Sequence, residues 1–455
     1  MISSKARAPL LAALTIDGIF VAFAGDGIRA YFTPDDMMNL YVSWSATPAE
    51  LLHNYRPLGA LVYRGLFALF GLNPLPYRVV CFAVLLANLG LLYRFCLKLS
   101  GSREAAALAC LLGAYHAHLA DLYYSTGTIY DLLCYLFFLL AFNFYLKIRE
   151  TGYPSWRQTA GLLALYGCAL ASKEMAVVLP LYVVIYEWIF HRTRWRRLIR
   201  IPLLWIAIPL TLLYAAGKVA GPQAMAANPD YAPHISLHAF LAAWRWYLGD
   251  LFYGVVSFNT TKLVLLWLLL AAFAAMLRRR EVWFAWCVLI LGVLPFIFIA
   301  PRGFFVMYLV LPGWYLFAAS VLLWMVRQLP RWAGWIAVRP EQLALFVVVA
   351  LLLIPLHREE KPLGNGWVAG AHQQVRTVLG QLEQRFPTMP PGSKVLFLSD
   401  PYDARDWILT SMFRLKYRDP DLRVDRVKVN PSLASRTADY AHVFELSYGG
   451  LRIVR

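Results

Sequence analysis

Two adjacent carboxylates, Asp35 and Asp36, follow the first apolar run of the sequence and are its first candidates for chemistry. One such carboxylate can act as a general base toward a hydroxyl group, while the second orients it or holds a cation. The residues Thr33, Pro34 and Asp36 also predict a helix N-terminus with a capping box. Capping by itself explains one aspartate and leaves the other unexplained, so both interpretations stay open.

A cation follows in the same polar stretch. Arg56 precedes Pro57, from which apolar residues recur at helical spacing, so we expect it at the N-terminus of an amphipathic helix on the membrane surface. Free N–H groups at such an end favour an anion, for example a phosphate. His53 and Tyr55 are predicted to support this site. The alternative is an arginine that only snorkels to the interface.

Three more charged residues lie in short turns between apolar runs, namely Lys173, Glu174 and Arg302. Charges there are costly unless they pair with each other or meet a ligand. Lys173 is predicted to bind a phosphate while Glu174 holds it, and a purely structural Lys–Glu pair is the alternative. Arg302 is predicted as a further phosphate-binding cation. Asp131 either caps the helix that follows it or faces the same site.

Composition identifies the surroundings of these residues. Of the 455 residues 60% are hydrophobic and only 15% are charged, and the mean hydropathy is +0.55. A soluble protein carries about 25% charged residues and could not hide so much apolar surface. This excludes an ordinary cytosolic enzyme and a disordered chain. The net charge is +17, and the basic residues that produce it lie at the edges of apolar runs. This pattern indicates that the partner is membrane lipid and not nucleic acid.

Eleven apolar runs approach the roughly 20 residues that a membrane-spanning helix needs. With the N-terminus inside, 19 lysines and arginines fall in inner segments and 9 in outer segments before residue 358. That bias predicts a cytoplasmic N-terminus and an extracytoplasmic C-terminus. The predicted spans are near 9–25, 76–96, 105–120, 128–146, 159–172, 175–190, 201–217, 262–277, 282–300, 303–326 and 342–356.

The predicted fold class is an all-α polytopic membrane protein with a small C-terminal α/β domain. Residues 1–357 form the membrane domain, with outer loops at 26–77 and 218–261, and residues 358–455 form the extracytoplasmic domain. Period-2 and helical patterns predict its elements. These are a helix over Gln373–Phe386, a strand over Lys394–Ser399, a helix from Asp403, and strands near Arg423–Val429 and His442–Ser447.

Three of these motifs together resemble the GT-C glycosyltransferases. They are the Asp35-Asp36 pair, Tyr55-Arg56-Pro57-Leu58, and Lys173-Glu174 before Leu179-Pro180. The likeness covers roughly residues 10–200 and is greatest to protein O-mannosyltransferases and their transmembrane relatives with TPR repeats. Here a small α/β domain stands in place of the repeats.

The resemblance implies transfer of a sugar, such as a mannose-like hexose, from a polyprenyl-phosphate carrier to an acceptor hydroxyl on the extracytoplasmic side. It implies that Asp35 or Asp36 is the base and that Arg56 and Lys173 hold the carrier phosphate. The acceptor is a protein, a lipid or a glycan, and a bacterial inner (plasma) membrane is the expected location.

This chemistry requires no cofactor, because the donor carries its own leaving group. A divalent metal is compatible with the aspartate pair but is not indicated. The sequence contains no phosphate-binding loop of the Walker type and no Gly-rich dinucleotide fingerprint. The alternative function is a transporter or flippase of a lipid-linked glycan. Transporters tend to place polar residues near the middle of the membrane, whereas most charges noted here lie at the ends of spans.

Overall fold

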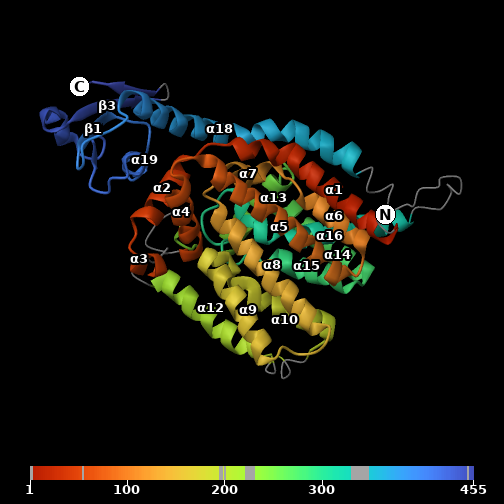
Figure 1. The fold of residues 1–455 in the computed structure, drawn as a ribbon. Helices are drawn as coiled ribbons and strands as arrows, with labels where there is room; N and C mark the ends of the chain where they lie inside the picture. Colours follow the sequence, from red (N-terminus) through yellow and green to blue (C-terminus); the bar gives the residue numbers. More distant parts are fainter. Residues whose placement is uncertain are drawn as a thin grey trace. The chain divides into compact units, whose positions relative to one another are not determined.

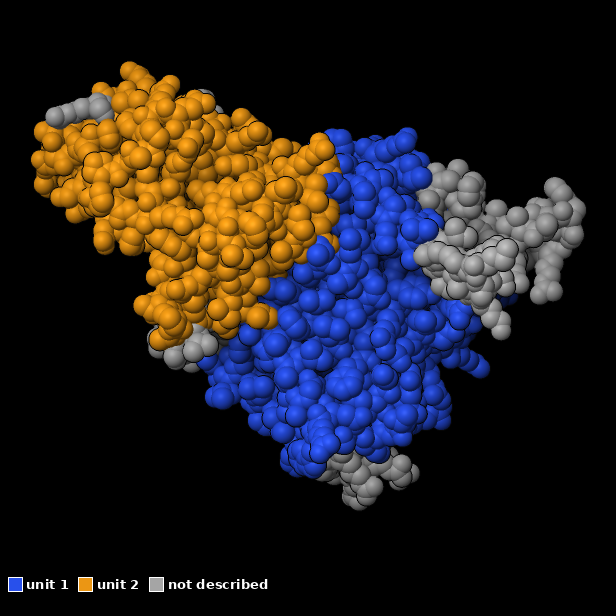
Figure 2. Space-filling model, viewed as in Figure 1, with its two compact units in different colours: residues 1–25, 83–119, 131–364 blue, residues 26–82, 120–130, 365–455 orange. Residues whose placement is uncertain are grey.

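The computed structural model describes residues 4–53, 56–193, 198, 201–220, 231–328, 348–447 and 450–454. The described chain is mostly helical, with one small sheet near the C-terminus (Figure 1). Its contacts define two compact units (Figure 2). Unit 1 consists of Met1–Gly25, Ala83–Leu119 and Asp131–Gly364, and unit 2 consists of Asp26–Phe82, Ala120–Tyr130 and Asn365–Arg455.

Apolar helices make up unit 1. Among the described residues, four helices are long and apolar enough to cross a membrane, and a fifth crossing is possible if one bent helix pair counts as a single span. The four are α5 (Pro74–Ser100), which begins in unit 2, α8 (Ile129–Arg149), α14 (Thr260–Leu277), and Glu174–His191, which joins the short η3 (Glu174–Val178) to α10 (Leu179–His191). A polytopic helical architecture is confirmed, and the number eleven stays a prediction.

Other elements of unit 1 match the predicted runs in part. The run at 105–120 is broken, because α6 (Arg103–Gly113) and the following segment Ala117–Tyr124 meet at 66°. The run at 282–300 is helical only as far as the end of α15, and that at 342–356 lies partly outside the described residues. The further elements are α1 (Ser4–Ala24), η2 (Ala117–Leu119), α9 (Trp156–Ser172), α12 (Pro202–Ala220), α13 (Leu237–Leu251), α15 (Arg280–Leu291), η6 (Phe304–Leu309), α16 (Leu311–Gln328) and the π-helix η7 (Val348–Leu353).

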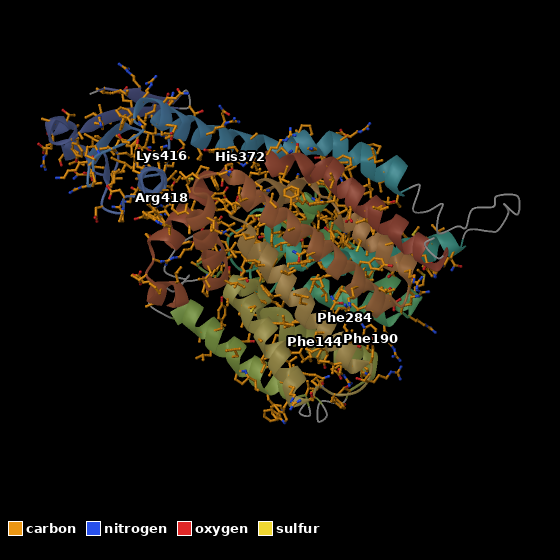
Figure 3. All side chains as sticks on the ribbon, in the orientation of Figure 1. Phe144, Phe190, Phe284, His372, Lys416 and Arg418 are labelled. Carbon is orange, nitrogen blue, oxygen red and sulfur yellow. The ribbon has the colours of Figure 1, made fainter. Side chains whose placement is uncertain are left out.

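Aromatic rings fill the interior of unit 1. Measured between ring centroids, Phe284 lies 6.2 Å from Phe190 (Figure 3). It lies 5.8 Å from Phe142. Beside them Glu187 is fully buried and accepts hydrogen bonds from Tyr145 at 2.8 Å and from Arg149 Nε at 2.6 Å. Arg149 also forms an ion pair with this carboxylate, so a charged partner offsets the cost of burying it.

Unit 2 combines the first polar loop with the C-terminal sheet. The loop contains η1 (Gly25–Arg29), α2 (Pro34–Ser45), α3 (Pro48–His53) and α4 (Pro57–Phe70), and α7 (Ala120–Tyr124) belongs to the same unit. The sheet has the order β2-β1-β3-β4. Strands β2 (Arg423–Arg426) and β3 (His442–Ser447) run parallel to the central β1 (Lys394–Ser399), and β4 (Gly450–Ile453) is antiparallel to β3.

Helix α19 (Ile408–Tyr417) joins the sheet to the loop, since it packs on α2. The rings of Trp407 and Tyr41 lie 5.7 Å apart, and Arg414 donates a hydrogen bond to the Tyr41 hydroxyl. The predicted α/β character of the C-terminal region is therefore confirmed. The helix that carries the aspartate pair packs directly against that region.

Most predicted C-terminal elements are present, with differences at their ends. The strands at Lys394–Ser399 and His442–Ser447 are confirmed, and β4 was not predicted. The predicted helix at Gln373–Phe386 is the end of a much longer helix, α18 (Ile354–Arg385), which contains Pro362. Proline removes one backbone hydrogen bond, and the rest of this helix continues around the gap. The helix predicted from Asp403 begins at Ile408 instead, because residues 400–406 form a loop around Arg426.

Candidate active site

Asp36 lies in the first turn of α2, where hydrogen bonds hold its carboxylate. Its side chain is fully buried, and Thr33 and Asp36 form the predicted capping box at the start of α2. Asp36 Oδ2 accepts from the Thr33 backbone N–H at 2.8 Å. Its Oδ1 accepts from Ser125 Oγ at 2.9 Å and from the Gly127 N–H. Charge-assisted bonds to three donors fix this carboxylate in place.

Asp35, which precedes Asp36, has a different environment. It is an exposed residue at the first turn of α2. The surrounding protein nevertheless removes enough water from its carboxyl group to raise its pKa, and the carboxylates of Asp36 and Asp406 raise it further. A carboxyl group with a raised pKa and an open face is suited to accept a proton from a substrate hydroxyl.

Arg56 occupies the predicted position before α4. It is the N-cap residue of that helix, Pro57 is the first helical residue, and its own side chain makes no capping bond. The guanidinium lies 5.5 Å from the centre of the Tyr130 ring. His53 is the last residue of α3, and Tyr55 lies outside the described residues. The arginine is half-buried, beside helix N–H groups that favour an anion.

Lys173 is buried in unit 1, where it bonds to Asp131. The Nζ–Oδ1 distance is 2.5 Å, and the side chains are only 8% and 7% exposed. The ammonium also lies 4.9 Å from the centre of the Phe305 ring. Glu174 is the next residue, the first of η3. The cavity beside Lys173 holds about 10 Å³, which is room for about one water molecule. A phosphate could reach this lysine only after the pair opens.

Arg302 differs from Lys173 because part of its guanidinium lacks a partner. Its Nε and one terminal nitrogen are buried and make no hydrogen bond within the described part of the chain. The group stacks 3.9 Å from the centre of the Tyr231 ring, and the Arg302 backbone N–H donates to the Tyr247 hydroxyl at 3.1 Å. Buried donors without partners are costly, so this arginine is a candidate for an anionic ligand.

The predicted site residues thus divide between the two units. Asp35, Asp36 and Arg56 lie in unit 2, whereas Lys173 and Arg302 lie in unit 1. Within unit 2 Asp36 is bonded directly to Ser125 and Gly127. Within unit 1 the lysine is held by Asp131. The sequence left two roles open for that aspartate, a helix cap or a place in the site.

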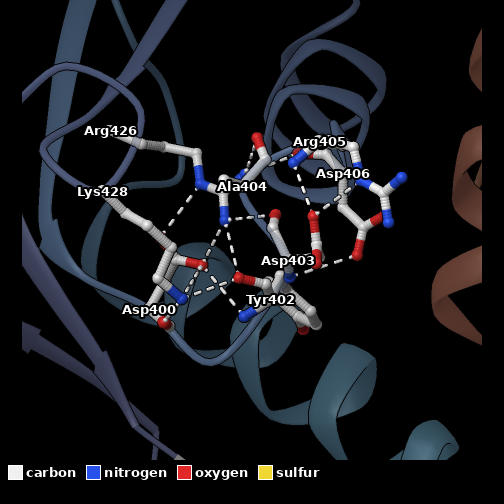
Figure 4. Close-up of polar contacts among 8 residues, drawn as sticks. All are labelled: Asp400, Tyr402, Asp403, Ala404, Arg405, Asp406, Arg426 and Lys428. Carbon is white, nitrogen blue, oxygen red and sulfur yellow. Dashed lines mark hydrogen bonds and ion pairs between the residues drawn. The ribbon is translucent and has the colours of Figure 1, made fainter.

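Sequence reasoning missed Asp406, whose carboxylate acts on Asp35 from the C-terminal region. Its loop is held by Arg426, which is 6% exposed. Arg426 forms two bonds to the Asp400 carboxylate, at 2.9 and 2.6 Å. The same guanidinium donates to the carbonyl oxygens of Tyr402, Asp403, Ala404 and Asp406 (Figure 4). Only the paired β1 and β2 strands bring these residues together, so sequence spacing could not reveal them.

Comparisons with known proteins show what the chain as a whole is similar to. The sequence model described as dolichyl-phosphate-mannose-protein mannosyltransferase matches residues 54–219. Protein O-mannosyl-transferase TMTC2 of Mus musculus is 28% identical over 215 residues, which are 44% of this chain and 26% of the relative. The Homo sapiens protein of that name gives the same identity and coverage. The chain thus spans about a quarter of the length of the curated relatives it matches.

A solved structure extends the likeness to nearly the whole chain. ArnT from Cupriavidus metallidurans, crystallised with undecaprenyl phosphate, aligns with a TM-score of 0.51 and 15% identity. The alignment covers 95% of this chain and 93% of that chain, so it includes most of the C-terminal sheet region. At this identity the match shows the fold. The predicted resemblance is confirmed: residues 54–219 match the dolichyl-phosphate-mannose-protein mannosyltransferase model, and the chain has the fold of ArnT.

Proposed function

We propose that this protein is a membrane glycosyltransferase that moves a sugar from a polyprenyl-phosphate carrier to an acceptor hydroxyl on the extracytoplasmic side. The observation that carries the proposal is the pair of unlike carboxylates in unit 2. One is buried and fully bonded, and its neighbour is exposed with a raised pKa. The match to the mannosyltransferase family supports a hexose donor, and the undecaprenyl phosphate bound by ArnT supports a polyprenyl carrier.

In this proposal Asp35 is the base. Its carboxylate takes the proton of the acceptor hydroxyl while that oxygen bonds to C1 of the sugar. The bond between C1 and the phosphate oxygen breaks, and its electron pair leaves with the carrier phosphate. Asp36 positions the base, because its three donors fix the first turn of α2. A well-placed base contributes roughly 10²- to 10⁴-fold to such a step.

Cations must stabilise the departing phosphate, which gains charge in the transition state. Arg56 suits this role because it stands at a helix N-terminus, and Arg302 suits it because its buried nitrogens lack partners among the described residues. Lys173 is the third proposed contact, and its use requires release from Asp131. Glu174, His53 and Tyr55 are proposed to support these groups. No step needs a metal or another cofactor.

The proposed location is a bacterial inner (plasma) membrane, with the N-terminus cytoplasmic and the C-terminal domain outside. The acceptor is a protein, a lipid or a glycan. A single cysteine at Ala46, in a variant without native cysteines, should react with an impermeant reagent from outside, whereas one at Ser155 should not. Labelling of Ser155 from outside would reverse the orientation and with it the proposed substrate side.

The function is tested with purified protein in lipid nanodiscs and polyprenyl-phosphate hexoses as donors. We expect release of polyprenyl phosphate with at least one hexose, and a loss of roughly 10²-fold or more in Asp35→Asn. Glu50→Gln is the matched control, since Glu50 is an exposed acid in the same loop and glutamine keeps its cap on Thr47. Mass spectrometry of lipid-linked sugars in cells with and without the protein identifies the donor. Release from no donor would refute the function, and full activity of Asp35→Asn would refute only the assigned base.

A further inference from the structure

A cavity of about 470 Å³ lies within unit 2, and neither aspartate of the pair lines it. The late turns of α18 form one wall, the end of α19 forms another, and the end of α4 with Tyr31 completes it. The charged residues that line it are Arg376, Glu383, Lys416 and Arg418 (Figure 3 labels the last two). A cavity of this size can take a small ligand group.

The charges around the cavity do not cancel. Lys416 forms an ion pair with Glu383. Arg376 and Arg418 make no ion pair with any carboxylate in the part of the chain that the structure describes. Burial raises the pKa of Tyr31, and the charge of Arg376 opposes that rise. Two arginines from different helices therefore face one cavity with an excess positive charge.

Arg418 is the C-cap residue of α19 and lines the cavity. Its φ of 50° lies in the left-handed region at the end of α19, a conformation that non-glycine residues adopt less often. The guanidinium lies 5.3 Å from the centre of the Phe67 ring. A Cβ at Gly71 would come within 3.3 Å of its terminal nitrogen, so glycine at that position leaves room for the group. The fork of an arginine fits an oxyanion bidentately.

This cavity is distinct from the proposed carrier-phosphate contact at Arg56. Arg56 precedes the first residue of α4, whereas Phe67 and Gly71 stand at its other end. A helix of 14 residues is roughly 20 Å long at 1.5 Å per residue. One phosphate group cannot bridge that length, so the cavity would hold a different anion.

We propose that this cavity binds an anionic group, a phosphate or a carboxylate, carried by the acceptor while its hydroxyl reaches the transfer site. The inference rests on the proposed transferase function and narrows its acceptor to an acidic molecule. The same oxyanion chemistry would come from an anionic lipid headgroup if the acceptor is a membrane lipid.

Calorimetric binding of inorganic pyrophosphate to the full-length protein tests the cavity directly. In nanodiscs of zwitterionic phosphatidylcholine we expect saturable binding that weakens roughly 10-fold or more in Arg376→Gln. Arg418→Asn should do the same, and asparagine tolerates the left-handed backbone. Arg385→Gln is the matched control, because Arg385 is exposed at the end of the same helix and does not line the cavity. Nanodiscs with phosphatidylglycerol test the lipid source, since competition there would assign the bound group to a headgroup.

Two results would overturn the proposal. One is the absence of pyrophosphate binding to the wild-type protein in zwitterionic nanodiscs. The other is binding that persists in the double variant Arg376→Gln and Arg418→Asn and is lost only in Arg56→Gln. Neither result depends on sugar transfer. If the cavity bound no anion, the proposed transferase function would still be tested separately by hexose release from the donor.

Discussion

Replacing Asp36 by asparagine should destabilise the first loop, although only one oxygen is exchanged for an amide nitrogen. The carboxylate accepts from the Thr33 N–H through one oxygen and from Ser125 and Gly127 through the other. Asparagine has a single acceptor oxygen. Whichever way its amide turns, an NH₂ group would face a buried donor on the other side.

The magnitude follows from those bonds. A hydrogen bond to a charged group contributes about 1.5–3 kcal/mol, and a buried donor left without a partner costs about 1–3 kcal/mol. If the asparagine oxygen accepts from Ser125 and Gly127, the bond from Thr33 is lost. If it accepts from Thr33, the bonds from Ser125 and Gly127 are lost. We therefore expect Asp36→Asn to lower the free energy of unfolding of unit 2 by about 2–5 kcal/mol.

The neighbouring substitution Asp35→Asn is the matched control, with the same chemical change one residue away. Because the folded-state pKa of Asp35 is raised, ionisation of this group opposes folding as the pH rises through that pKa. The Asp35→Asn variant should thus have neutral or slightly increased stability at pH 7, and this advantage should vanish in acid below the ordinary aspartate pKa. Its transfer activity should nevertheless be lost.

Thermal unfolding in nanodiscs, followed alongside donor turnover, separates the two residues. Tyr124 and the Ser125–Gly127 segment should become faster in hydrogen exchange in Asp36→Asn and stay unchanged in Asp35→Asn. The reasoning fails if Asp36→Asn unfolds at the wild-type temperature with wild-type exchange. It also fails if Asp35→Asn destabilises the protein as strongly as its neighbour does.

Three further substitutions test other parts of the arrangement. Asp406→Asn removes a carboxylate that raises the pKa of Asp35, so the acid limb of the pH profile of kcat/KM should move to lower pH. An acid limb at the wild-type pH would show that Asp406 does not influence the ionisation of Asp35. Lys173→Met should destabilise unit 1 by about 3–5 kcal/mol, because it removes the ammonium that forms an ion pair with a buried carboxylate, and adding Asp131→Asn should restore most of the melting temperature unless the pair has no structural role. Arg426→Met should cost about 3–5 kcal/mol in thermal unfolding, since it also frees the carbonyl oxygens of its loop; a wild-type melt would show that the loop holds itself.

Local features of the protein could be predicted where the cause is local. The capping box at Thr33 and Asp36, the start of α4 at Pro57, and the strands β1 and β3 are all as expected. Caps and alternating patterns depend on residues within a few positions of each other, so the sequence alone contains them. The apolar runs likewise predicted a polytopic helical chain, because their length and composition decide it.

Partners across long stretches of sequence were decided only by the tertiary structure. Two of the three donors to Asp36 lie about 90 residues further along the chain, and Lys173 bonds to Asp131 over 42 residues. Helix α19 packs on α2 across more than 350 residues, and with it the C-terminal loop reaches Asp35. The two aspartates are identical in sequence terms, and the three donors buried against one of them make their roles different. Composition and spacing specify which groups are available, whereas burial and long-range contacts determine which of them keeps a free lone pair and an open face for a substrate.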